Sequence, residues 1–449
     1  MVDRLFGTDG IRGIANRYPM VADVALKVGR AAGSIFHQED RPHTILIGKD
    51  TRRSGYMFEN ALTSGLCSMG VDVLLVGPLP TPGVSYIMRS LRCDAAIMIS
   101  ASHNEFHYNG IKFFGPDGFK IADSVEQEIE RLLTTGDVDN IQTTAENVGT
   151  ARRIDDAVGR YIEFAKATFP KGMRLDGLRI VCDCANGAAY KVGPSCLREL
   201  GAEVIAIADR PDGRNINDAC GSVHPAEMRA GVIRERADLG IAFDGDGDRV
   251  VMADEEGRLL DGNALVSILA VNMLERGELP CGAVATTVMA NAGLLRAIEP
   301  LGGSVVWAPV GDRHVVEAMR QRGLMLGGEP SGHIVMLEHN TTGDALITAL
   351  HVLATLVRKE QRLSVLAEVY RPLPEAHLSV PFEPGQAPSE DSLRALAQEA
   401  EAGLDGQGRV VVRVSGTEPV VRVMVQHEVL REAEKTAQAV ADRIVALDL

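Results

Sequence analysis

The sequence predicts an α/β protein of three related domains with mixed or parallel sheets, followed by a smaller C-terminal α+β domain. Between residues 21 and 365, short apolar runs alternate with longer segments of helical periodicity, which is typical of βαβ units. The apolar runs are nearly continuous, as expected for strands covered by helices on both faces. Residues 370–449 differ, because a hairpin pattern there is followed by a helix.

The strands and helices are expected in three cycles of similar order. In the first cycle we expect helices at 21–38 and 54–70, and strands at 43–50, 71–80 and 95–102. In the second we expect strands at 178–188, 202–209 and 239–248, and helices at 193–201 and 225–237. In the third we expect strands at 282–291, 303–312 and 324–337, and helices at 293–302 and 313–323. The tail reads as a hairpin at 408–428 and a helix at 431–447.

Polar stretches mark the expected domain limits. They lie at 134–149, at 253–262 and at 370–377. The chain is thereby divided into domains over residues 1–152, 153–254, 255–369 and 370–449. A chain of 449 residues is long enough for each domain to bury its own core.

Charge and composition narrow the functional classes. The net charge of −15 disfavours nucleic acid and anionic membrane as partners, although basic groups could still converge on a small anion. The seven cysteines are scattered and fit neither a zinc site nor a CxxC redox pair, so we expect reduced thiols. The sequence shows no signal-peptide pattern and no long apolar run, which predicts a cytoplasmic protein.

The segment DGDGDR at 244–249 is the sharpest single motif. Asp244, Asp246 and Asp248 alternate with glycines, so a flexible loop can direct three carboxylates at one cation. A calcium EF-hand is an alternative, but Arg249 stands where its turn needs glycine, and the loop follows a strand. The pattern favours Mg²⁺ over calcium, and a solvated acidic turn is the remaining interpretation.

The segment SGTEPVVRV at 415–423 suits a phosphate. Small residues at Ser415, Gly416 and Thr417 let backbone N–H groups and hydroxyls approach an anion. Arg422 can add two parallel hydrogen bonds. The same residues are also ordinary hairpin-turn chemistry, so the motif gains weight only beside a metal site and a nucleophile.

Two further polar loops follow apolar runs. GGEPSGH at 327–333 carries Glu329, Ser331 and His333, which suit the hydroxyls of a polyol or form a plain polar turn. ISASHN at 99–104 carries Ser102 and His103. The serine lacks the GxSxG spacing of a hydrolase, but phosphoryl transfer needs little activation of the nucleophile when a metal and cations neutralise charge. We therefore predict that Ser102 carries a phosphoryl group.

Five motifs in order resemble the α-D-phosphohexomutases over essentially the whole chain. They are GTDGIRG at 7–13, SASHN with NGIKFF at 100–114, DGDGDR, GEPSGH and SGTEPVVRVM. The resemblance implies four domains around a central cleft. With the segment PDGRNINDACGSVHP at 211–225 included, the sequence most resembles members that interconvert glucosamine 6-phosphate and glucosamine 1-phosphate. The resemblance implies that the product supplies UDP-N-acetylglucosamine for peptidoglycan precursors.

The resemblance also assigns roles to the motif residues. Ser102 would be a phosphoserine that forms a hexosamine 1,6-bisphosphate intermediate and, with the three aspartates, holds Mg²⁺. Around it would lie Arg12, His103, Lys112, Arg249 and His333, with Lys112 or His333 as proton shuttle. Glu329 and Ser331 would hold the sugar, and Ser415, Gly416, Thr417 and Arg422 its distal phosphate.

Alternatives and departures accompany this resemblance. A phosphomannomutase or phosphoglucomutase of the same family is the first alternative, and a non-catalytic sugar-phosphate sensor is the second. Glu105 stands where the family commonly has proline, and Pro330 where glucosamine-specific members have glutamine. A carboxylate at position 105 must point outward. Members of this type are often homodimers.

Overall fold

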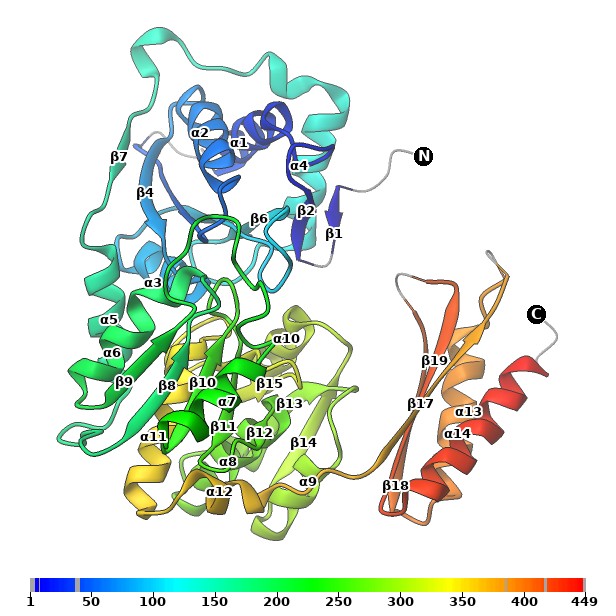
Figure 1. Ribbon diagram of the computed structural model, residues 1–449. Coiled ribbons are helices and arrows are strands. Elements are labelled where there is room, and N and C mark those ends of the chain that lie inside the picture. Colours follow the sequence, from blue (N-terminus) through cyan, green and yellow to red (C-terminus); the bar gives the residue numbers. More distant parts are fainter. Residues whose placement is uncertain (1–4, 8, 37–40, 384–385, 416–417, 447–449) are drawn as a thin grey trace.

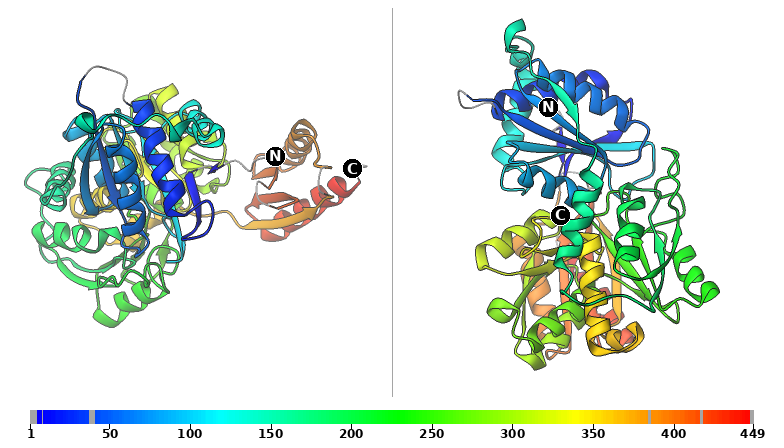
Figure 2. Two further views of the ribbon diagram at one scale, coloured as in Figure 1. Left: turned by 90° about the horizontal axis from the view of Figure 1, so that it is seen from above. Right: turned by 90° about the vertical axis from the view of Figure 1, so that its left-hand side faces the viewer.

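The computed structural model describes residues 5–7, 9–36, 41–383, 386–415 and 418–446. Among these residues the strands form four sheets, of seven, five, four and three strands. Three α/β units lie together, and the unit with the smallest sheet stands to one side of them, joined through an extended segment (Figures 1 and 2). The predicted fold class is confirmed. Within the described chain we find no helix with the length and apolar character needed to cross a membrane.

The first domain is built on the sheet β1-β2-β6-β5-β3-β4-β7. Its elements are β1 (Phe6–Gly7), β2 (Gly10–Ile14), α1 (Ala22–Phe36), β3 (Thr44–Lys49), α2 (Gly55–Cys67), β4 (Asp72–Pro78), α3 (Thr81–Ser90), β5 (Ala95–Ile99), β6 (Tyr108–Phe114), α4 (Asp123–Thr135) and β7 (Ala151–Arg153). In β3, Ile45 and Ile47 enter one apolar cluster while Leu46 enters another. Successive side chains thus face opposite sides of the sheet, and both sides are buried, which explains the continuous apolar run.

The second domain is built on the sheet β12-β11-β10-β8-β9. Its elements are α5 (Ala157–Thr168), β8 (Arg179–Asp183), α6 (Val192–Glu199), β9 (Glu203–Ile207), α7 (Ala226–Glu235), β10 (Leu239–Phe243), β11 (Val250–Asp254) and β12 (Leu259–Leu260). The third domain is built on the sheet β14-β13-β15-β16. Its elements are α8 (Gly262–Glu275), β13 (Ala283–Thr287), α9 (Gly293–Ile298), β14 (Ser304–Ala308), α10 (Asp312–Arg322), β15 (Leu326–Gly328), β16 (Ile334–Met336), α11 (Ala345–Lys359) and α12 (Leu363–Leu366).

The three α/β domains share one topological core. In each, the first strand of the core pairs in parallel with the next two along the chain, and the fourth strand adds antiparallel to the third. The third and fourth strands are β5 and β6, β10 and β11, and β15 and β16. The predicted single strand at 324–337 is this last antiparallel pair, interrupted by a loop. In all three domains, the loop between the third and fourth strands carries a motif found in the sequence.

The C-terminal domain packs helices on one face of its sheet β17-β19-β18. Its elements are β17 (Glu375–Pro381), α13 (Glu390–Ala402), β18 (Gly408–Val414), β19 (Val420–His427) and α14 (Leu430–Val445). Val421, Val423 and Val425 enter the core beneath the helices. Because side chains alternate along a strand, Arg422 lies on the opposite face, and Arg413 pairs directly with it across the ladder.

Candidate active site

The loop after β5 delivers Ser102 to the loop after β10. Ser102 is buried and has a left-handed φ of 50°, so its backbone turns sharply. Its Oγ donates a hydrogen bond to Asp244 Oδ2 at 2.6 Å and lies 3.5 Å from His103 Nδ1. Residues 142 positions apart in the chain are therefore in contact, as the family resemblance implied.

The three aspartates of DGDGDR form a cluster able to hold a cation. Asp244, Asp246 and Asp248 are buried, and each offers a carboxylate oxygen within 4.8 Å of the others. Burial and the charges of the other two carboxylates raise the pKa of Asp244. Among the described residues, Asp246 Oδ1 and Asp248 Oδ1 have no hydrogen-bond partner. Clustered hard oxygens with free lone pairs fit a divalent cation such as Mg²⁺.

Thr81 positions Asp246 from the first domain. At the start of α3, the Thr81 backbone N–H donates to Asp246 O, and its Oγ1 donates to Asp246 Oδ2, both at 2.8 Å. The sequence reading missed this residue, although it lies in a polar position between a strand and a helix. A helix start in one domain thus fixes the middle aspartate of the next.

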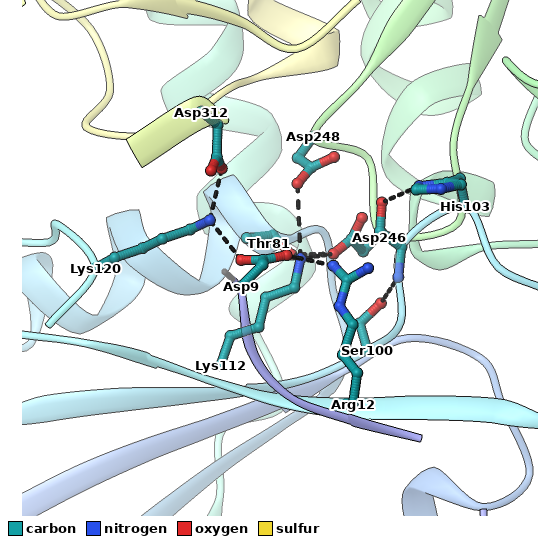
Figure 3. A network of polar contacts seen from close by, with 12 residues as sticks. Asp9, Arg12, Thr81, Ser100, His103, Lys112, Lys120, Asp246, Asp248 and Asp312 are labelled. Atoms are coloured by element: carbon teal, nitrogen blue, oxygen red, sulfur yellow. Dashed lines mark hydrogen bonds and ion pairs between the residues drawn. The ribbon is translucent and has the colours of Figure 1, made fainter. Parts of the chain in front are cut away.

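Lys112 supplies a positive charge to the aspartate cluster. Its Nζ lies 3.1 Å from Asp246 Oδ2, 3.2 Å from Asp9 Oδ2 and 3.8 Å from Asp248 Oδ2 (Figure 3). Burial lowers the pKa of Lys112, but the carboxylates of Asp246, Asp9 and Asp248 outweigh it, so the net shift is upward. A lysine held in its charged form is a fixed cation. The role of Lys112 as a proton shuttle stays a prediction.

Asp9 and Arg12 extend the cluster toward the third domain. Asp9 pairs with Arg12 and with Lys120, and Lys120 Nζ contacts Asp312 Oδ2 at 2.6 Å. A cavity of about 780 Å³, lined in part by Lys120 and Asp312, lies beside this network. Asp9 lies in the GTDGIRG motif with Arg12, so the motif could have identified it as a site residue. Lys120 and Asp312 lie in no motif.

His103 and Arg249 face each other beside Ser102. Arg249 Nη1 lies 3.2 Å from His103 Nδ1, and Arg249 Nε lies 3.8 Å from Asp248 Oδ1. Burial, together with the charges of Arg249 and Arg12, lowers the pKa of His103 to about 4. His103 is therefore a neutral imidazole at pH 7, next to a guanidinium that is positively charged.

The GEPSGH loop of the third domain meets the metal-ligand loop of the second. Arg249 and His333 form an antiparallel bridge, and Val250 N donates to Gly332 O. His333 Nε2 accepts from Gly343 N at 3.1 Å, which turns Nδ1 toward Asp248 Oδ2 at 3.6 Å. Glu329 is half-buried and its carboxylate interacts electrostatically with Arg249, whereas Ser331 is exposed. All six predicted catalytic residues, with the aspartates, therefore lie in one region built by three domains.

The predicted phosphate loop lies in the fourth domain. Ser415 closes the β18–β19 hairpin through its N–H to Val420 O at 2.8 Å. Arg422 contacts Ser379 Oγ at 2.6 Å and also pairs with Glu418. The predicted residues Gly416 and Thr417 lie outside the described residues.

The sequence reading missed Arg413, which lies opposite Arg422. Both arginines line a cavity of about 250 Å³ that also includes Met289 of the third domain. Arg413 Nε is buried and has no hydrogen-bond partner in the described parts of the chain. Two like charges on one face of a ladder repel each other unless an anion lies between them. Arg413 is two residues before Ser415, so the strand alternation could have revealed it.

Comparisons with known proteins agree with this architecture. Sequence models described as phosphoglucomutase/phosphomannomutase domains I, II and III and C-terminal domain match residues 3–139, 159–257, 261–373 and 368–443. The chain belongs to the phosphoglucomutase/phosphomannomutase family. As a member of this family it is an enzyme of the isomerase class, an intramolecular phosphotransferase.

Curated relatives in the phosphoglucomutase/phosphomannomutase family are similar over nearly the whole chain. The phosphoglucosamine mutase of Magnetococcus marinus is 54% identical over 442 residues, which cover 98% of this chain and 91% of that protein. The phosphoglucosamine mutase of Geotalea uraniireducens is 51% identical over 442 residues, covering 98% of this chain and 97% of that protein.

Solved structures of other proteins share the fold at low identity. A phosphoglucomutase/phosphomannomutase family protein from Burkholderia thailandensis has a TM-score of 0.81 at 24% identity, with 98% of each chain covered. The N-acetylphosphoglucosamine mutase of Aspergillus fumigatus, in complex with GlcNAc-6P and magnesium, has a TM-score of 0.66 at 20% identity, with 98% of this chain and 95% of that chain covered.

Proposed function

We propose that this enzyme interconverts glucosamine 6-phosphate and glucosamine 1-phosphate through a phosphoryl group carried on Ser102. The contact between Ser102 Oγ and Asp244 Oδ2 carries the proposal, because it places a hydroxyl nucleophile against a cluster of metal-type ligands. The curated relatives with this activity in their names, at 54% and 51% identity, support the choice of sugar. The product would feed UDP-N-acetylglucosamine synthesis in the cytoplasm.

The first transfer moves a phosphoryl group from the serine to the sugar. A hydroxyl oxygen of the sugar phosphate attacks phosphorus and the bond from phosphorus to Ser102 Oγ breaks. The sugar hydroxyl loses its proton and the released serine oxygen takes one up. The products are a hexosamine 1,6-bisphosphate and a free serine side chain. The bisphosphate then turns within the site, Ser102 Oγ attacks the other phosphorus, and the bond from that phosphorus to the sugar oxygen breaks. Ser102 is phosphorylated again, and the proton lost from its hydroxyl is balanced by the one that the released sugar hydroxyl takes up. Such transfers depend mainly on positioning and on neutralising charge.

Fixed cations lie where that charge develops. Arg249 is half-buried beside His103, Lys112 is buried beside Asp246, and Arg12 adds a third positive charge. Asp244, Asp246 and Asp248, with the Ser102 oxygen, would hold Mg²⁺, which when bound would withdraw charge from the phosphoryl oxygens. Neutral His103, 3.5 Å from Ser102 Oγ, is available as a proton acceptor on the catalytic side.

The rest of the substrate would lie between the third and fourth domains. We assign the sugar hydroxyls to Glu329 and Ser331, with His333 alongside, and the distal phosphate to the hairpin residues Ser415, Gly416, Thr417 and Arg422. Arg413 joins this set, because it shares a cavity with Arg422 and has a free buried Nε. Guanidinium groups bind phosphate through parallel hydrogen bonds, so two arginines make a strong site.

Intact-mass measurement on purified protein tests the nucleophile. The wild-type chain should carry a phosphate adduct, Ser102→Ala should lack it and lose turnover, and the matched Ser195→Ala variant in α6 should keep both. Turnover that survives in Ser102→Ala would overturn the mechanism.

A substrate panel tests the choice of sugar. Glucosamine 6-phosphate, glucose 6-phosphate and mannose 6-phosphate are compared with and without added glucose 1,6-bisphosphate. We expect the highest kcat/KM for glucosamine 6-phosphate. A higher value for mannose or glucose 6-phosphate would favour the phosphomannomutase or phosphoglucomutase alternative.

Light scattering on the same samples would test the expected homodimer.

A further inference from the structure

The turn at residues 102–104 is held through its backbone carbonyls. Ser102 adopts φ of 50°, a conformation that a serine rarely takes and that requires support from its surroundings. Ser102 N donates to Ser100 Oγ at 2.9 Å. The carbonyl oxygens of Ser102 and Asn104 both point at donors from other parts of the chain, and the direction of the Ser102 side chain depends on them.

Arg52 supplies one donor from the first domain. Its Nη2 donates to Ser102 O at 3.2 Å and also to Asn104 O. Its Nη1 pairs with Asp50, and neither side chain is exposed to solvent. One end of the guanidinium is thus anchored on a buried carboxylate, while the other end spans two carbonyls of the turn.

Asn217 supplies the second donor from the second domain. Its Nδ2 donates to Ser102 O and to Asn104 O, both at 2.9 Å. Asn217 is buried and has a φ of 56°, which asparagine tolerates better than most residues. A Cβ at Gly245 would lie 2.5 Å from Ser102 O, so only glycine allows the aspartate loop to approach this close.

We infer that Arg52 and Asn217 are positioning residues for the phosphoryl-transfer step, an assignment that rests on Ser102 being the phosphorylated residue. Both side chains donate hydrogen bonds to the carbonyl oxygens of Ser102 and Asn104, so they hold the turn at both ends. They also join the two domains whose side chains must meet at Ser102 Oγ. A displacement of a reacting group by about 1 Å can lower a rate by roughly 100-fold, so loss of this support acts on catalysis. Glu105, the residue after this turn, has an exposed side chain and does not contribute to these hydrogen bonds.

The first test replaces Asn217 by two residues that accept its φ. Asn217→Asp keeps the shape but removes the donors, and Asn217→Gly removes them without adding charge. Phosphorylated enzyme is mixed with glucosamine 6-phosphate, and loss of the phosphate adduct is followed by quenched intact-mass measurement. We expect the transfer rate and kcat to fall by about 10- to 100-fold in both variants, with KM changed less than about twofold.

The matched control is Asn186→Asp in the same domain. Asn186 also has a left-handed φ, of 47°, and its amide contacts Asn215 and Cys220 rather than the serine turn. The control should transfer at the wild-type rate with a melting temperature like that of Asn217→Asp. Equal rates in the control and both Asn217 variants would overturn the inference, as would a rate loss explained by unfolded protein.

A second variant tests the arginine. Arg52→Lys keeps a charge for Asp50 but cannot span both carbonyls, so it should slow transfer with KM retained. Transfer at the wild-type rate in Arg52→Lys would remove Arg52 from the assignment. Wild-type protein that never carries phosphate would instead refute phospho-Ser102, and with it the proposed function. An adduct in the wild type together with normal transfer in the Asn217 variants refutes the positioning role alone.

Discussion

The catalytic centre and the hairpin of the fourth domain are built in opposite ways. At the centre, side chains from three domains meet in buried contacts: Ser102 on Asp244, Lys112 on Asp246, and His333 beside Asp248. At the hairpin, Arg422 is 43% exposed on its side chain and pairs with Ser379 and Glu418 of its own domain. The centre requires three domains to meet, whereas these polar contacts of the hairpin lie within the fourth domain, and the third domain contributes Met289 to the cavity beside them.

The difference separates chemistry from binding. Groups that touch the reacting atoms must be fixed before the substrate arrives, because reorganisation would add to the barrier. A phosphate-binding arginine can exchange a surface carboxylate for a phosphate, since exposed ion pairs contribute only about 0–1 kcal/mol. The fourth domain meets the third through buried contacts such as Asn291 with Leu373, so it presents the hairpin without joining the centre.

Removal of divalent cations should have the largest effect, and it should act on the catalytic centre rather than on the hairpin. With a chelator, turnover should fall to background and return with Mg²⁺, because the aspartate cluster would lose the charge that activates transfer. The fold should persist, since Lys112 still pairs with Asp246 and Asp248. Assays with and without chelator, beside thermal unfolding, check this. Unfolding that follows metal removal would show that the cation is structural, as the calcium-binding alternative predicts.

Asp246→Asn should lower kcat by about 10²- to 10³-fold. The substitution removes one charge from the cluster but keeps a group that can accept from Thr81. Relief of repulsion between neighbouring carboxylates should leave the melting temperature unchanged or slightly higher. Steady-state kinetics and calorimetry measure both, with the exposed Asp176→Asn as control. Parallel losses of rate and melting temperature would contradict a role confined to the site.

Arg422→Ala and Arg413→Ala should act mainly on KM. A hydrogen bond to a charged group contributes about 1.5–3 kcal/mol, so KM should rise roughly 10- to 100-fold. Because the distal phosphate is held in both ground and transition states, kcat should change little. Kinetics of both variants and of Arg394→Ala, an exposed arginine of the same domain, test this. A fall in kcat with KM unchanged would place these arginines at the chemistry instead.

Glu418→Gln should give the smallest effect. It removes the charge that competes with phosphate for Arg422. Because exposed ion pairs are weak, KM should fall by no more than about fivefold, and kcat should stay constant. The effect should shrink at high salt, where the pair is screened. A raised KM would mean that Glu418 supports the loop rather than competing with the ligand.

The fold was predictable because its local signals agree with its packing. The apolar runs around Ile45 and Ile97 are strands buried on two faces, and the motifs fall where those strands end. The antiparallel fourth strands were less visible, since β15 and β16 read as one apolar segment. Seven of the described helices were not predicted, although α8 and α11 begin with aspartate caps. They are α3, α4, α5, α8, α11, α12 and α13.

The site was only partly predictable because several of its residues act through tertiary contacts. Asp244 and Ser102 lie in recognisable motifs, whereas Lys120 and Asp312 lie outside all of them. Asn217 lies in the segment at 211–225, but its role is visible only from its contacts with Ser102 and Asn104. Lys112 likewise pairs with Asp9, which lies between β1 and β2. Domain limits remain proposals. The strand β12 (Leu259–Leu260) pairs with β11 and so extends the second sheet beyond residue 254.

The recurrence of one strand–loop–strand unit in three domains has an evolutionary consequence. The loops after β5, β10 and β15 occupy the same structural position in the three domains, and the roles we propose for them differ: nucleophile, metal ligands and sugar contacts. Each can change its side chains while its own sheet stays intact, so preference for one sugar over another can drift without a new scaffold. The three domains also depend on one another, because no single domain contains the proposed nucleophile, metal ligands and sugar contacts together.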